Sequence, residues 1–199
     1  LTEHISFLTY RVIELAVQDI AKWRDHGREI KIAINLSARN FLDPRLATFL
    51  IDTAEAYGVS PNWLQLEITE TLLMKDPDVA AAITQRLHDA GFNLVLDDFG
   101  TGYSSLAYLG RFPISGVKID RSFIEQMTSD ERSKDIVAAT IDLTHKLGFT
   151  VTAEGVESQE AEALLARLGC DYLQGYRYLK PVERAAFDSW YIEHTGNNV

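Results

Sequence analysis

Cysteine is almost absent from this chain, and long apolar segments are absent too. The single cysteine, Cys170, cannot form a disulfide within the chain, which fits a reducing compartment such as the cytoplasm. No apolar stretch approaches the roughly 18 residues needed to cross a bilayer. Leu1–Tyr10 contains neither a basic region nor a small-residue cleavage site, so it does not resemble a signal peptide. We therefore expect a cytoplasmic protein with no membrane segment in this chain.

Positive charge is also scarce. The 199 residues include 19 lysines and arginines against 29 aspartates and glutamates, a net charge of −10. A surface this acidic repels nucleic-acid backbones, so DNA and RNA are not expected as partners. A small phosphorylated ligand is still compatible with the charge, provided that a bound cation reverses the local field.

Short apolar segments rich in β-branched residues alternate with longer segments of helical period. Their apolar content predicts strands that are covered on both faces. The six predicted strands are Ile30–Leu36, Trp63–Ile68, Phe92–Leu96, Gly116–Ile119, Phe149–Ala153 and Asp171–Leu173. A helix is predicted before them, over Ile5–Trp23. Strands that alternate with helices pair in parallel through right-handed crossovers, which places the fold in the α/β class.

Residues typical of helix ends recur between these segments. Asp43-Pro44 and Asp76-Pro77 each predict an N-cap residue followed by proline at the first helical position. A glycine follows each of five helical segments, where it suits the left-handed residue that ends a helix. These glycines are Gly27, Gly58, Gly91, Gly148 and Gly169.

Two parallel architectures fit this pattern, an open doubly wound sheet and a TIM-like (β/α)8 barrel. No predicted strand is followed by the glycine fingerprint of a dinucleotide-binding fold. A barrel takes about 250 residues, and about six of its eight βα units are visible here. If the fold is a barrel, we expect about two units to be missing at the N-terminus. No linker interrupts the chain, so residues 1–199 are expected to form a single domain.

Polar residues follow almost every predicted strand. They are Asn35, Glu67, Asp97, Asp98, Lys118, Asp120, Glu154 and Gln174. Each one alone has an ordinary explanation, because Asp or Glu after a strand often caps the next helix. In parallel α/β folds, however, chemistry collects at the carboxyl ends of the strands. Together these residues predict a functional site.

The predicted site is dominated by carboxylates. Two of them about 4 Å apart repel by roughly 4 kcal/mol at an effective dielectric constant of 20, so the group holds either protons or cations. Oxygen ligands suit Mg²⁺, Mn²⁺ or Ca²⁺, and Asp97 with Asp98 can bridge two ions, an arrangement used in phosphoester hydrolysis. Lys118 would stabilise an anionic transition state or form an ion pair with Asp97 or Asp120.

Six motifs occur in order between Leu1 and Pro181. They are Asn35-Leu36-Ser37, Glu67-Ile68-Thr69-Glu70, DDFGTGYSSL at 97–106, KIDRSF at 118–123, EGVE at 154–157 and QGY at 174–176. This set resembles the EAL domain family of cyclic-di-GMP phosphodiesterases, and DDFGTGYSSL is nearly a signature by itself. The resemblance implies a (β/α)8-type barrel that carries cyclic-di-GMP across its mouth. It also implies two Mg²⁺ or Mn²⁺ ions beneath one phosphate, with Ca²⁺ as an inhibitor.

The resemblance assigns roles to individual residues. It implies that the metal ligands are Asn35, Glu67, Asp97 and Asp98, with Asp97 bridging the ions. Glu154 would be the general base or orient the attacking water, and Lys118 would contact that water or the phosphate. The reaction would open cyclic-di-GMP to linear pGpG.

The remaining matched residues would support the site. Gln174 would touch the ligand, while Glu157 and Asp120 would support the site from behind the residues that contact the ligand and the ions. Glu70 would brace the loop at 100–105, which in the family contributes to a homodimer contact. Family members are often fused to sensory or GGDEF modules.

The Glu-Ala-Leu segment that names the family is absent, so we expect the domain to be N-terminally incomplete. Its glutamate is a metal ligand in the family, which leaves alternatives to catalysis. One is a catalytically inactive receptor or scaffold domain that binds cyclic-di-GMP. Another is a different metal-dependent phosphohydrolase on a similar barrel.

Overall fold

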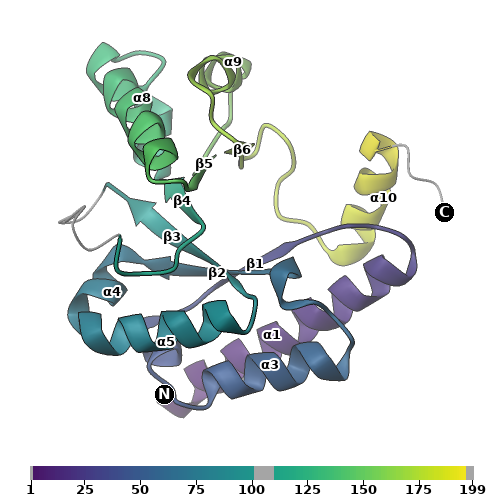
Figure 1. The fold of residues 1–199 in the computed structure, drawn as a ribbon. Helices are drawn as coiled ribbons and strands as arrows, with labels where there is room; N and C mark the ends of the chain where they lie inside the picture. Colours follow the sequence, from purple (N-terminus) through teal and green to yellow (C-terminus); the bar gives the residue numbers. More distant parts are fainter. Residues whose placement is uncertain (1, 101–109, 196–199) are drawn as a thin grey trace.

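Six parallel strands form one sheet, in the order in which they occur along the chain (Figure 1). The computed structural model describes residues 2–100 and 110–195. The strands are β1 (Ile32–Asn35), β2 (Leu64–Thr69), β3 (Asn93–Phe99), β4 (Gly116–Ile119), β5 (Thr150–Ala153) and β6 (Tyr172–Leu173). Each lies within three residues of its predicted bounds. Because every connection advances the sheet by one position in the same direction, the sheet curls into part of a barrel.

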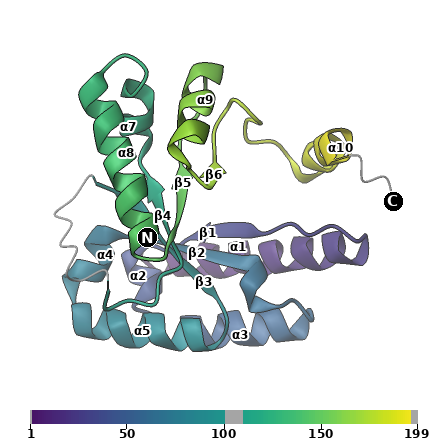
Figure 2. The same ribbon diagram turned by 45° about the horizontal axis from the view of Figure 1, so that its top comes forward.

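Helices cover the outer face of the sheet, except for α10 (Arg184–Thr195), which lies apart from it (Figure 1). The other helices are α1 (Thr2–Asp25), α2 (Ala38–Phe41), α3 (Leu46–Ala56), the 3-10 helix η1 (Pro61–Trp63), α4 (Glu70–Lys75), α5 (Pro77–Asp89), α7 (Arg121–Gln126), α8 (Glu131–Lys146) and α9 (Gln159–Leu168). Helices α1, α3 and α5 lie along β1–β3, whereas α8 and α9 lie beside β4–β6 (Figures 1 and 2).

The two faces of the sheet differ in character. Side chains alternate between faces along a strand, and those beneath the helices are apolar and fully buried, as at Leu66, Leu94 and Val151. The inner face carries polar side chains, and at the two edge strands Asn35 and Tyr172 are exposed. The expectation of strands covered on both faces therefore holds for the central strands, where β4 is buried at every position, and is wrong at the edge strands β1 and β6, whose inner faces are exposed.

The predicted helix ends are mostly confirmed. All five glycines have positive φ, and the Asp76 side chain caps α5 by accepting from the Val79 N–H. The prediction that Asp43 caps a helix is wrong, because α3 begins only at Leu46. Its carboxylate instead accepts from the Arg45 N–H at 3.0 Å and pairs with the Arg45 guanidinium at 2.8 Å.

The C-terminal helix α10 lies beside the second half of α1 (Figure 1). Two carboxylates join α10 to α1 and the turn that follows it. Asp188 Oδ1 accepts from Trp23 Nε1 at 2.7 Å and from Arg28 Nη1 at 2.8 Å, and Asp19 Oδ1 accepts from Arg184 Nη1 at 2.8 Å. The Trp23 and Phe187 rings pack with their centroids 5.3 Å apart. We call Asp188, Trp23, Arg28 and the nearby Arg184 the Asp188 network. It attaches a helix that has no buried residue of its own.

Among the described residues, no helix combines the length and the apolar content needed to span a membrane.

Candidate active site

The strand register brings the predicted site residues to the inner face of the sheet. Asn35 pairs with Glu67 on the neighbouring strand. Asp97 lies two residues beyond Val95, the partner of Glu67. Residues two apart on a strand face the same way, so Asn35, Glu67 and Asp97 share one face. Three strands thus present one polar side chain each at the same end of the sheet.

An irregularity at the end of β3 changes how its two aspartates point. The register with β4 shifts between Leu96 and Phe99. Asp98 has φ of 55°, the one positive φ at a non-glycine position in the described residues. In a regular strand, adjacent side chains point to opposite faces. Here, ligand oxygens of Asp97, Asp98 and Glu154 all lie within 4.8 Å of one another.

Lys118 lies among three carboxylates of this site, those of Glu67, Asp97 and Glu154. Its Nζ is 2.8 Å from Glu67 Oε1, 2.5 Å from Glu154 Oε1 and 3.5 Å from Asp97 Oδ1. The side chains of Lys118 and Glu67 are each only 3% exposed. We call Lys118, Glu67, Asp97, Asp98 and Glu154 the Lys118 cluster. It contains one cation and four carboxylates.

The pKa values of the cluster reflect burial and this imbalance of charge. Burial acts to lower the pKa of Lys118, but its hydrogen bonds to Glu154 and Glu67 outweigh burial and raise it. Burial raises the pKa of Glu154, and the charges of Asp97 and Glu67 add to the effect against the opposing effect of Lys118. Partial desolvation and the charges of Asp97 and Asp120 raise the pKa of Asp98.

One atom of the cluster lacks a hydrogen bond in the described structure. Asp97 Oδ1 is buried and has no hydrogen-bond partner, although Lys118 Nζ lies 3.5 Å away. A buried carboxylate oxygen without a donor costs free energy. A divalent cation, which prefers carboxylate and amide oxygens, would satisfy it.

Residues 1–181 match the family described as the EAL domain. The chain belongs to the EAL domain family. It is 36% identical over 180 residues to the cyclic di-GMP phosphodiesterase PdeR of Escherichia coli, an alignment that covers 90% of this chain and 27% of PdeR. The chain spans about a quarter of the length of the curated relatives it matches.

Solved EAL domains share the fold. The PaMucR phosphodiesterase in complex with c-di-GMP has a TM-score of 0.90 and 36% identity, covering 94% of this chain and 76% of that one. The EAL domain of Mycobacterium smegmatis DcpA has a TM-score of 0.87 and 31% identity, covering 93% of this chain and 84% of that one. The α/β class with a TIM-like barrel is therefore confirmed for this EAL domain.

Most of the predicted site residues of the EAL domain lie together. Besides the Lys118 cluster, Asn35 lies next to Glu67 in the sheet. Gln174 is placed beside the exit of β5, where its N–H donates to Ala153 O at 2.8 Å and its carbonyl accepts from Val156 N at 3.0 Å. The segment around 101–109 lies outside the described residues.

Three residues predicted to support the site lie outside the Lys118 cluster. Asp120 caps α7 by accepting from the Ser122 N–H at 3.0 Å, so it is no ion-pair partner of Lys118. Glu157 is exposed and lines a separate pocket of about 250 Å³ between α7 and α9. Glu70 is buried as the first residue of α4, and the loop that it was expected to brace lies outside the described residues.

Sequence reasoning missed the closest partners of Lys118. It named Asp97 and Asp120, whereas Glu67 and Glu154 lie nearest. A signal was available in the alternation along β2, where Gln65 and Glu67 interrupt apolar neighbours and so share the inner face. That pattern assigns Glu67 to the face on which Lys118 lies.

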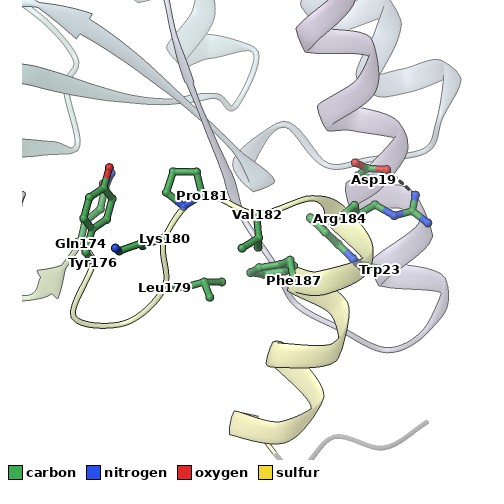
Figure 3. Close-up of a pocket in the computed structure, with 11 residues that line it drawn as sticks. Asp19, Trp23, Gln174, Tyr176, Leu179, Lys180, Pro181, Val182, Arg184 and Phe187 are labelled. Atoms are coloured by element: carbon green, nitrogen blue, oxygen red, sulfur yellow. Dashed lines mark hydrogen bonds and ion pairs between the residues drawn. The ribbon is translucent and has the colours of Figure 1, made fainter.

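A pocket of about 460 Å³ lies away from the Lys118 cluster. The pocket lies between the segment after β6 and the helices α1 and α10. Gln174 and Tyr176 line one side of it, and Trp23 and Phe187 line the other (Figure 3). The two edge strands of the sheet flank this region. Gln174 is the one predicted site residue that lines the pocket.

Proposed function

We propose that this EAL domain hydrolyses cyclic-di-GMP to linear pGpG with the help of two divalent cations. The observation that carries the proposal is the Lys118 cluster, in which three carboxylates surround one buried lysine and a fourth, that of Asp98, lies beside Asp97 and Glu154. A structural ion pair needs no such excess of negative charge. The names of relatives and structural neighbours, phosphodiesterases and c-di-GMP complexes among them, support the same substrate.

The donor set fits Mg²⁺ or Mn²⁺. Asn35, Glu67, Asp97 and Asp98 offer only oxygen, which suits hard divalent cations. Asp97, which is buried and lacks a hydrogen-bond donor at Oδ1, would be among the residues that hold the ions. When bound, the ions would polarise the scissile phosphate and lower the pKa of the attacking water.

The side chains of the cluster would share the remaining work. Glu154, whose pKa is raised, would accept the proton of the attacking water as general base. The water oxygen would form a bond to phosphorus while the bond from phosphorus to one ribose 3′ oxygen breaks. Lys118 would stabilise the negative charge that develops on the phosphate, and Gln174 would bind the ligand.

A receptor that binds cyclic-di-GMP without turnover is the second candidate. Lys118 favours it, because its Nζ already pairs with Glu67, Glu154 and Asp97. Those contacts neutralise part of the cluster without any metal ion. Tight binding with no hydrolysis would support this alternative.

We also propose a homodimer that involves the 100–105 segment, fusion to sensory or GGDEF modules, and a cytoplasmic location, which the single cysteine favours. A monomeric mass in solution for a fully active protein would contradict the dimer.

The experiment is to incubate the protein with cyclic-di-GMP and Mg²⁺ and to quantify pGpG by chromatography. Asp97→Asn should reduce turnover by more than about a hundredfold, since even residues that only support metal ligands cost 10- to 100-fold. Asp52→Asn, the same change at an exposed position of α3, is the matched control. Full activity after exhaustive chelation would refute the metal mechanism.

A further inference from the structure

One carboxylate on α9 binds the segment that carries Gln174. Glu162 Oε2 accepts from Arg177 Nε at 3.1 Å, and its Oε1 accepts from the Tyr178 hydroxyl at 3.1 Å. Each oxygen of the carboxylate therefore has its own donor. Both donors lie on the chain that leaves β6, three and four residues after Gln174.

The backbone of the same segment is bonded to the exit of β5. Val156 N donates to Gln174 O at 3.0 Å, and Arg177 N donates to Val156 O at 3.0 Å. Glu154, the proposed base, lies two residues before Val156. Arg177 thus joins two sets of contacts, the backbone bonds to Val156 and the side-chain pair with Glu162.

Close packing makes this arrangement sensitive to displacement. A Cβ atom at Gly175 would collide with the backbone of Val156, so the chain there has no room to shift inward. The residues around it contribute little burial, since Tyr176 is 55% exposed and Tyr178 is 38% exposed. The position of the segment therefore depends on its hydrogen bonds and on Glu162 more than on apolar packing.

We propose that Glu162 is a positioning residue that fixes Gln174 for binding of the cyclic dinucleotide. The proposal rests on the proposed function, because it assigns Glu162 to the ligand-binding side of that site. Glu162 touches none of the residues of the Lys118 cluster in the described structure. Because Glu162 holds the segment of the ligand-binding residue Gln174, we expect its effect mainly on ligand affinity.

The kinetic test compares Glu162→Ala with Glu160→Ala. Glu160 lies on the same helix, is exposed and forms no ion pair among the described residues, so the control removes an equal charge near the same helix end. We expect Glu162→Ala to raise KM for cyclic-di-GMP up to about fivefold, because a partly exposed ion pair is worth up to about 1 kcal/mol. The kcat value should stay within about twofold of wild type, as expected for lost uniform binding.

A double-variant cycle tests whether Arg177 carries the effect. Arg177→Ala should raise KM as well, and Glu162→Ala in that background should add less than it does in the wild type. Fully additive effects would overturn the proposal. So would an unchanged KM in Glu162→Ala, or a loss of kcat that matches the rise in KM.

A ligand-free measurement separates this proposal from the proposed function. Amide hydrogen exchange at Val156 and Arg177 should be faster in Glu162→Ala than in wild type, and unchanged in Glu160→Ala. If the wild-type protein neither binds nor cleaves cyclic-di-GMP, the proposed function fails while the exchange data still decide the role of Glu162. Unchanged exchange in Glu162→Ala would overturn the positioning role even in an active enzyme.

Discussion

The Lys118 cluster and the Asp188 network both combine carboxylates with positively charged side chains, but the proportions of donors and acceptors are opposite. In the Asp188 network, one carboxylate oxygen accepts from Trp23 and Arg28. Arg184, which binds Asp19 at 2.8 Å, lies 3.7 Å from the other oxygen. In the Lys118 cluster, one ammonium group faces several carboxylates. The first network has donors in excess, and the second has acceptors in excess.

This difference separates a structural contact from a functional one. A carboxylate surrounded by donors is satisfied within the protein and stabilises the attachment of α10 to α1. A group of partly buried carboxylates around one lysine remains under-neutralised, and burial, together with the neighbouring negative charges, raises the pKa values of Glu154 and Asp98. Such a group is costly for folding unless a further cation binds, so the imbalance itself points to function.

The largest expected effect comes from removing the central cation. Lys118→Met should lower the free energy of unfolding by about 3–5 kcal/mol, because it leaves Glu67 and its neighbours buried without a partner. Urea denaturation in a metal chelator measures this change. A variant as stable as the wild type would mean that the carboxylates are already protonated or hydrated.

Metal binding should stabilise the protein in a pH-dependent way. Because the pKa values of Glu154 and Asp98 are raised in the folded, metal-free protein, the protonated forms of these two groups favour the folded state. This stabilisation is fully present below the ordinary carboxyl pKa of about 4. That contribution is lost as the pH rises through the raised values. Mg²⁺ competes with the protons on Glu154 and Asp98. Its stabilising effect should therefore grow as the pH rises through the raised pKa values of these groups.

Thermal unfolding with and without Mg²⁺, at pH 4.5 and pH 7.5, tests this expectation. A concentration of 100 times Kd adds about 2.7 kcal/mol, and the rise in Tm should be larger at pH 7.5. An equal rise at both pH values would contradict competition with the Glu154 and Asp98 protons. Asp97→Asn should reduce the rise, whereas Asp52→Asn should leave it unchanged.

Disruption of the Asp188 network should change the stability of the protein but not its turnover. Asp188→Ala leaves Arg28 and the Trp23 N–H, both largely buried, without their acceptor, and should cost about 1–3 kcal/mol. Turnover per folded molecule should remain at the wild-type level. A specific loss of phosphodiesterase activity in this variant would remove the distinction between the two networks.

The strands could be predicted from the sequence because their signals are local. Apolar segments, with glycines such as Gly58 and Gly91 at the preceding helix ends, place β2 and β3 to within three residues. The helix caps were predicted less accurately than the strands. Asp43 and Asp76 both precede proline, but only Asp76 caps a helix, since the nearby Arg45 side chain binds the Asp43 carboxylate instead.

The contacts within the site could not be predicted in the same way. Adjacent aspartates on a regular strand would face apart, and the register shift between Leu96 and Phe99 that brings Asp97 and Asp98 together depends on pairing with β4. The Asp188 network left no signal at all, because Trp23 and Arg28 are 165 and 160 residues away from Asp188. Both features arise from long-range packing.

The smallest expected effect has the opposite sign to those of the other substitutions, and it tests the comparison between the Lys118 cluster and the Asp188 network most directly. In metal-free protein, Asp97→Asn removes one negative charge from the Lys118 cluster, and the new amide can donate to a neighbouring carboxylate. Stability should therefore rise by up to about 1 kcal/mol, whereas Asp188→Asn, the same substitution in the Asp188 network, should lower it. Chemical denaturation of both variants in chelator measures the pair. A loss of stability in Asp97→Asn as large as that in Asp188→Asn would mean that Asp97 is satisfied within the fold, and the excess of carboxylates would then no longer argue for a bound cation.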